Sequence, residues 1–354
     1  MAPLHMTPYG ALAIYDSGAP EGAENYTTLV VMHGLVFTIA SFAPLLQYVR
    51  KYNVRLILVN RRGYPGTMPF NEEDMAQLKV AYDGPSPESA NAVRAHLQAR
   101  VKEIYELLAS LILKEDIKEN SIILSAWSLG TMFINSFLAY GPNVAVGNVN
   151  VVAYIKRVTV YDAPFICMGY PPYAGGYSPI RDPELSAEEG IKRFPFWVSG
   201  YYKHGSTVSE LEVRNALPTP KATFVAMSAN ESIPVVYSPP GAVDGSDFML
   251  AWGAIKNDTF VEVKDAALKP EKRGDQWAKI PWRHIWGDHS IWEVVYGQWQ
   301  LEKDIAATRK SGSFARPIEA IRLPGCNHFA QWDCPEELLR AFLDVDANGR
   351  VEVL

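Results

Sequence analysis

The sequence predicts an α/β fold in which helices cover both faces of a mostly parallel central sheet and a further helical segment is inserted. Continuous apolar runs recur along the chain, and such runs are typical of strands buried on both faces of a parallel sheet. Helical patterns alternate with these runs, as crossovers between parallel strands require. A long segment of different composition then interrupts the alternation.

The predicted strands are short runs of aliphatic and β-branched residues, bounded by glycine, proline or polar residues. In chain order they cover residues 11–15, 28–36, 54–60, 121–125, 151–161, 281–287 and 318–323. The predicted helices of the core have apolar residues three and four positions apart. They cover residues 41–50, 85–113, 131–140, 293–310 and 335–343. This order of strand and helix indicates a doubly wound sheet.

Residues 165–279 break the rhythm and are rich in Tyr, Pro, Gly and Trp, with helical stretches at 184–194 and 207–217. A segment of this length is too long for a loop, so we interpret it as an inserted, mostly helical lid. The predicted organisation is therefore a core in two parts, residues 1–164 and 280–354, that flank the lid.

The composition is that of a globular protein: of 354 residues, 48% are hydrophobic and 12% aromatic. The net charge of −6 and the lack of a Lys/Arg cluster argue against a nucleic-acid partner. No apolar stretch is long enough to span a membrane, and the N-terminus does not resemble a secretory signal.

The three cysteines, Cys167, Cys326 and Cys334, have neither a disulfide-framework nor a metal-site spacing, which favours a reducing compartment. We therefore expect a cytoplasmic protein. A dinucleotide fingerprint, a phosphate loop and a metal-ligand motif are all missing from the sequence, so no cofactor and no metal is expected. The oligomeric state stays open.

The segment Ala126-Trp127-Ser128-Leu129-Gly130 joins a predicted strand to a predicted helix. A serine between two small residues at such a junction is typical of a nucleophile elbow, a sharp turn that exposes the hydroxyl above the sheet. The small neighbours let strand and helix approach closely. The following helix directs its free N–H groups toward an oxyanion on the substrate.

With this elbow, the chain resembles the α/β-hydrolase family over nearly all of its length. Four segments match the family in the expected order: His33-Gly34 after a strand, the turn at 62–66, the elbow at 126–130, and the loop at 325–328 with the Pro-Glu-Glu that follows at 335–337. The resemblance implies that Ser128 is the nucleophile and His328 the general base. It also implies an oxyanion hole from the backbone N–H groups of Leu129 and of Leu35, with Val36 as the alternative to Leu35.

The acid of the triad has three candidates. The commonest family pattern places it in the turn after residues 281–287, where this chain has Ser290 at the expected position and Asp288 two residues earlier. The second known location directly follows the preceding strand, and Asp162 stands there. We favour Asp162, because a strand-end residue braced by Pro164 can hold the histidine tautomer. Asp288 and Glu293 remain alternatives.

The resemblance implies a cofactor-independent serine hydrolase that cleaves a carboxylic ester or lactone through an acyl-enzyme. Aromatic residues of the lid suggest an apolar small-molecule substrate, and Trp127, Tyr202 and Trp332 are candidate pocket residues. The epoxide hydrolase and dehalogenase branches resemble this chain but carry aspartate at the nucleophile position. A hydroxynitrile lyase, an acyltransferase or a binding protein that retains the triad remain alternatives.

Overall fold

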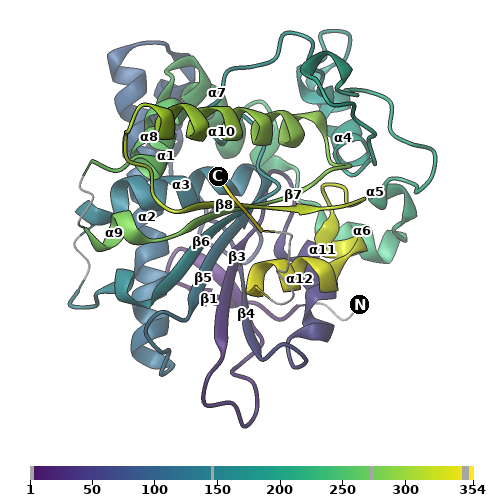
Figure 1. Ribbon diagram of the computed structural model, residues 1–354. Coiled ribbons are helices and arrows are strands. Elements are labelled where there is room, and N and C mark those ends of the chain that lie inside the picture. The colour runs from purple at the N-terminus through teal and green to yellow at the C-terminus, as the bar shows by residue number, and fades with distance from the viewer. Residues whose placement is uncertain (1–3, 145–146, 272–274, 345–350) are drawn as a thin grey trace.

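A nine-stranded sheet runs through the middle of the protein (Figure 1). The computed structural model describes residues 4–144, 147–271, 275–344 and 351–354. The strands are β1 (Thr7–Tyr9), β2 (Leu12–Asp16), β3 (Thr27–Met32), β4 (Val54–Asn60), β5 (Ile122–Trp127), β6 (Ile155–Tyr161), β7 (Trp282–Gly287), β8 (Ile318–Leu323) and β9 (Val351–Val353). Their order is β1-β2-β4-β3-β5-β6-β7-β8-β9. The strands from β4 to β8 in this order are parallel, and β1, β2 and β9 pair antiparallel at the edges.

Helices cover both faces of the sheet, which is why its central strands are buried from end to end. Figure 1 shows α12 (Pro335–Leu343) on one face and α2 (Pro87–Lys114), α3 (Thr131–Tyr140) and α10 (Trp292–Lys310) on the other. The helix η1 (Ile39–Tyr48) packs against α12 and the short α11 (Ala330–Asp333). The predicted α/β class, with its mostly parallel sheet, is confirmed.

Residues 165–279, hereafter the insert, lie between β6 and β7 and, where described, add no strand to the nine-stranded sheet. The α-helices in the described part of the insert are α4 (Ala187–Val198), α5 (Thr223–Ala226), α6 (Ala229–Val235), α7 (Ser246–Lys256), α8 (Thr259–Leu268) and α9 (Gln276–Lys279). Helix α7 packs on α1 (Glu72–Asp83), and α8 packs on α3. The second half of the insert therefore extends the helical layer of the core.

Two helical predictions differ from the structure. The stretch at 207–217 forms a single turn, η6 (Val208–Glu210), because the side chain of Glu212 accepts hydrogen bonds from the backbone N–H groups of Arg214 and Asn215. The stretch at 41–50 is a 3₁₀-helix rather than an α-helix, and it contains Pro44, which has no N–H to donate.

The chain reverses its direction of travel across the sheet between β3 and β5. From β3 it proceeds to β4 on one side, and from β5 it proceeds through β6, β7 and β8 on the other. In open α/β sheets a crevice forms at this switch point, outside the carboxyl ends of the strands. The end of β5 at Trp127 and the end of β3 at Met32 therefore mark the expected place of a binding site.

None of the helices in the described part of the chain combines the length and the apolar character that crossing a bilayer requires.

Candidate active site

Ser128 follows the last residue of β5 and adopts the left-handed backbone conformation, with φ of +54°. This conformation is costly for a residue with a side chain, and it persists only where the surroundings hold it. Two glycines make the close packing possible. A Cβ on Gly130 would lie 2.4 Å from the carbonyl oxygen of His33, and one on Gly34 would lie 2.8 Å from Cβ of Ser128. The local sequence thus produces the elbow that it predicts.

His328 lies in the loop after β8, fully buried, and its Nδ1 is 2.5 Å from Oδ2 of Asp162. Its Nε2 is buried and has no hydrogen-bond partner among the described residues. The indole of Trp127 lies against the imidazole with 5.0 Å between ring centroids, and its Nε1 donates to the backbone oxygen of His328 over 3.0 Å. The histidine loop is therefore attached to the residue that directly precedes Ser128.

Asp162 directly follows β6 with φ of +48° and is completely buried. Besides its contact with His328, its Oδ1 accepts from the backbone N–H of Gly287 over 2.8 Å. Its Oδ2 accepts from Oγ of Ser290 over 2.5 Å. Ser290, which stands where the commoner family pattern has the acid, thus donates to the carboxylate that comes from the neighbouring strand.

The two alternative carboxylates have other partners. Asp288 accepts from the backbone N–H of Gly325 over 2.6 Å and lies 3.4 Å from the guanidinium of Arg322, so it braces the turn after β7. Glu293 forms an ion pair of 2.5 Å with Arg181 of the insert. Burial raises the pKa of Glu293, against the opposing effect of Arg181. Of the three candidates, Asp162 contacts the imidazole of His328.

The loop between β3 and η1 borders the elbow. Leu35 and Leu129, the two residues predicted for the oxyanion hole, both line the pocket above Ser128. The N–H of Val36 donates to the phenol oxygen of Tyr64 over 3.1 Å. This contact occupies the N–H that was the alternative to that of Leu35.

A buried charged network lies behind this loop. Arg61 forms two hydrogen bonds with Asp247 of α7, at 2.9 and 2.6 Å, and Tyr64 donates to the same carboxylate over 2.8 Å. Arg61 also donates to the backbone oxygens of His33 and Gly34. Burial and the nearby Arg61 lower the pKa of His33. No local pattern marks Asp247, because its partners Arg61 and Tyr64 are far away in the chain.

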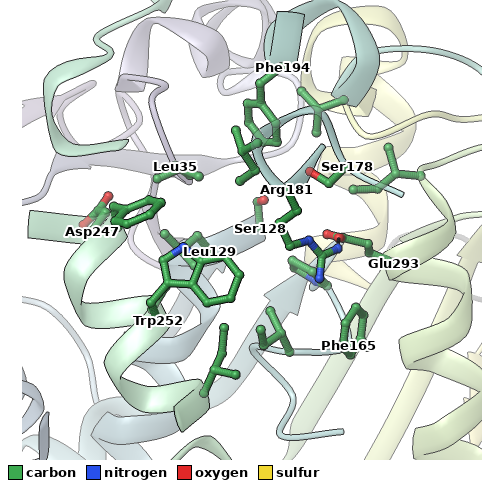
Figure 2. Close-up of a pocket in the computed structure, with 18 residues that line it drawn as sticks. Leu35, Ser128, Leu129, Phe165, Ser178, Arg181, Phe194, Asp247, Trp252 and Glu293 are labelled. Carbon is green, nitrogen blue, oxygen red and sulfur yellow. Dashed lines mark hydrogen bonds and ion pairs between the residues drawn. The ribbon is translucent and has the colours of Figure 1, made fainter. Parts of the chain in front are cut away.

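The pocket above Ser128 encloses a cavity of about 90 Å³. Its walls are mainly apolar and come from both the core and the insert: Leu35, Leu129, Phe165, Ile180, Phe194, Phe248, Trp252 and Ile291 are among them. Figure 2 shows Arg181 and Glu293 on one side of Ser128 and Trp252 on the other. The ion pair between Arg181 and Glu293 therefore adds a polar patch to an apolar wall.

The three predicted pocket residues do not line this cavity. Trp127 is fully buried below the elbow, packed against Phe37 and Phe329. Tyr202 is buried in the insert and donates to the backbone oxygen of Trp197. Trp332 lies in α11 and packs against the core. The sequence places these aromatic residues near the elbow or in the insert, but it does not show which way they face.

Comparisons with known proteins identify the family and the fold. A model of the Alpha/beta hydrolase family matches residues 29–341. An epoxide hydrolase from Vigna radiata is similar in structure, with 14% identity over 94% of this chain and 93% of that chain and a TM-score of 0.55. The potato (Solanum tuberosum) epoxide hydrolase has 14% identity over 96% of this chain and 98% of that chain, with a TM-score of 0.53. A laboratory-evolved variant of the potato enzyme has 13% identity over 97% of this chain and 98% of that chain, with a TM-score of 0.56. A search of curated proteins by sequence finds no match. At these identities the structural likeness shows the fold alone.

Proposed function

The chain belongs to the α/β-hydrolase family, and from this membership we propose that it is a serine hydrolase of carboxylic esters or lactones. One observation carries the proposal: a strained serine at the switch point of the sheet directly follows Trp127, whose indole packs on a histidine with a buried carboxylate at its Nδ1. Asp162 is the proposed acid, Ser128 the proposed nucleophile and His328 the proposed base.

The contact with Asp162 determines which nitrogen of His328 can act. With Nδ1 donating to the carboxylate, Nε2 carries the lone pair that can accept the proton of Ser128. The serine oxygen then attacks the substrate carbonyl, and the protonated His328 returns its proton to the departing alcohol. Water, activated by the same nitrogen, cleaves the acyl-enzyme and releases the carboxylic acid.

Leu35 and Leu129 are the proposed oxyanion donors. Both residues border the pocket at the elbow, whereas the backbone N–H of Val36 already donates to Tyr64. Loss of one such donor typically lowers turnover about 10²- to 10³-fold.

The pocket supports an apolar substrate, because aliphatic and aromatic side chains form most of its wall. The similar solved structures are named epoxide hydrolases. That family branch carries aspartate where this chain has Ser128, and a serine nucleophile leads to an acyl-enzyme rather than to opening of an epoxide. The ester or lactone is therefore the substrate class that we propose.

A fluorophosphonate probe tests the nucleophile. We expect the probe to label the wild-type protein rapidly and His328→Gln much more slowly. Ser128→Ala should stay unlabelled. Ser178→Ala is the matched control, because Ser178 lines the same pocket on the insert side. Labelling of Ser128→Ala would overturn the assignment.

A panel of aryl esters with short and bulky apolar acyl groups then tests the substrate class, and bulky esters should have the higher kcat/KM. Labelling without turnover of any ester would favour the lyase or acyltransferase alternative.

A further inference from the structure

Two of the three cysteines lie close together next to the loop that carries His328. Cys326 precedes the histidine by two positions and is buried. Cys334 directly precedes α12 and is partly exposed. Glu337, in the first turn of α12, is the third member of the group. The Sγ atoms and a carboxylate oxygen of these residues all lie within 4.8 Å of one another, and Sγ of Cys326 is 4.0 Å from Oε2 of Glu337.

This spacing is close to that of a metal centre. With metal–sulfur distances of about 2.3 Å and metal–oxygen distances of about 2.0 Å, tetrahedral geometry separates a sulfur and an oxygen ligand by roughly 3.5 Å. The contact between Cys326 and Glu337 needs to shorten by only about half an ångström to reach that value. A rotation of the Glu337 side chain can supply such a movement.

The position of Cys334 also suits a thiolate. Cys334 is the N-cap residue of α12, where the helix dipole stabilises negative charge. A thiolate is the form of cysteine that binds metals.

We propose that Cys326, Cys334 and Glu337 form a binding site for a thiophilic divalent cation of the Zn²⁺ class, with a solvent molecule as fourth ligand. Two sulfur ligands and one carboxylate select zinc or cadmium over magnesium and calcium, which prefer oxygen ligands. The sequence predicted no metal site, because the separation of the two cysteines matches no common motif. The fold brings them together, since the loop after β8 returns to the start of α12.

An ion at this place would join two parts of the active-site region. Cys326 belongs to the loop of His328, and its backbone oxygen accepts from the N–H of His289 in the turn after β7. Through Glu337 the ion would attach this loop to α12. Binding is therefore expected to raise the thermal stability of the folded protein, because the ligands are gathered in the folded state alone.

The test is titration of the reduced full-length protein with Cd²⁺ in a phosphine reductant, followed by the ultraviolet absorption of cadmium thiolates. We expect one ion per chain, displacement of Cd²⁺ by Zn²⁺ but not by Mg²⁺, and a higher Tm with either bound ion. Cys334→Ser and Glu337→Gln should each weaken binding by at least about 100-fold, because loss even of residues that support metal ligands costs about 10- to 100-fold.

Cys167→Ser is the matched control. It removes the remaining thiol, which is buried near Leu129, and it should leave the stoichiometry and the affinity unchanged. The proposal is overturned if reduced wild-type protein shows no thiolate absorption with Cd²⁺. Unchanged affinity in Cys334→Ser, or loss of the bound ion in Cys167→Ser, would contradict it equally. Circular dichroism of each variant identifies any that has failed to fold. If Cys334→Ser does not fold, the Cd²⁺ affinity of Glu337→Gln tests the proposal in its place.

Discussion

The carboxylate of Asp162 accepts two hydrogen bonds besides its contact with His328. One donor is the backbone N–H of Gly287, and the other is the hydroxyl of Ser290. Both donors belong to the end of β7 and the turn that follows it. The turn that commonly supplies the acid in this family therefore supplies hydrogen-bond donors to Asp162, the proposed acid of this protein.

Asp162→Asn is predicted to lower kcat by about 10⁴-fold, because an amide at this position favours the wrong imidazole tautomer and cannot stabilise the imidazolium. Asp288→Asn is the matched control: it lies in the neighbouring turn and braces Gly325 without contacting His328. Its kcat should stay within a few-fold of wild type. Steady-state hydrolysis of an activated aryl ester measures both. A collapse confined to Asp288→Asn would move the acid to the β7 turn.

Ser290→Ala is predicted to lower kcat by about tenfold or more while the protein stays folded. The substitution removes a hydrogen bond to a charged group, and such bonds contribute about 1.5–3 kcal/mol. The remaining Gly287 donor keeps the carboxylate in place. Ester hydrolysis together with urea unfolding separates the effect on turnover from the effect on stability. An unchanged kcat would show that Ser290 does not orient the acid.

Hydrogen bonds hold the loop that follows β3 against the insert. The N–H of Thr38 donates to the backbone oxygen of Val235 over 2.9 Å, and the N–H of Tyr237 donates to that of Val36 over 2.6 Å. Tyr64 links Val36 to Asp247 of α7. An outward movement of this part of the insert would therefore break contacts of the proposed oxyanion loop.

Tyr64→Phe is predicted to lower kcat by about tenfold with little change in KM. The phenol oxygen occupies the Val36 N–H and contacts Asp247, so its removal loosens the loop that carries Leu35. Misplacement of the Leu35 N–H would weaken the stabilisation of the transition state more than the binding of the substrate.

Glu262→Gln is the control for this element. Glu262 of α8 pairs with Arg94 of α2 at a more exposed place, so it is a second contact between insert and core, distant from the loop. Pairs of this kind contribute about 0–1 kcal/mol, and its kinetics should match wild type. Equal effects of the two variants would mean that the insert acts as a whole rather than through Tyr64.

At the scale of the whole molecule, three histidines besides His328 are buried within the core layers. Burial lowers the pKa of His33 and His96 well below the ordinary value, and it lowers the pKa of His284 to about 4. His284 accepts from the N–H of Ala163, next to Asp162, and its other nitrogen contacts Gln298. Both contacts suit the neutral imidazole.

The free energy of unfolding is predicted to fall as the pH decreases below about 6.5, the ordinary histidine pKa. Below that pH the unfolded chain binds protons that the folded protein excludes, so each such histidine lowers stability by about 1.4 kcal/mol per pH unit. For His284 this loss continues down to about pH 4. Above pH 6.5 the contribution of these groups is constant.

Urea unfolding at pH 7.5, 6.0 and 5.0 measures the slope. His96→Gln should reduce the slope of unfolding free energy against pH by about 1.4 kcal/mol per pH unit, which corresponds to one proton. His5→Gln, at an exposed position, should leave the slope unchanged. A stability that is flat between pH 7.5 and 5.0 would contradict the prediction.

The sequence by itself determined the strand order along the chain, the elbow and the candidate roles of Ser128 and His328. These features depend on local patterns: apolar runs, small residues beside a serine, and glycines whose absent side chains permit a close approach, as at Gly130. Tertiary structure decided what depends on residues distant in the chain. It selected Asp162 over Asp288 as the partner of His328, joined Arg61 to Asp247, turned Trp127 away from the pocket and placed Cys326 beside Cys334. The physical reason is that side-chain direction and burial at these positions follow from the packing of strands, helices and insert against one another, which no local pattern records.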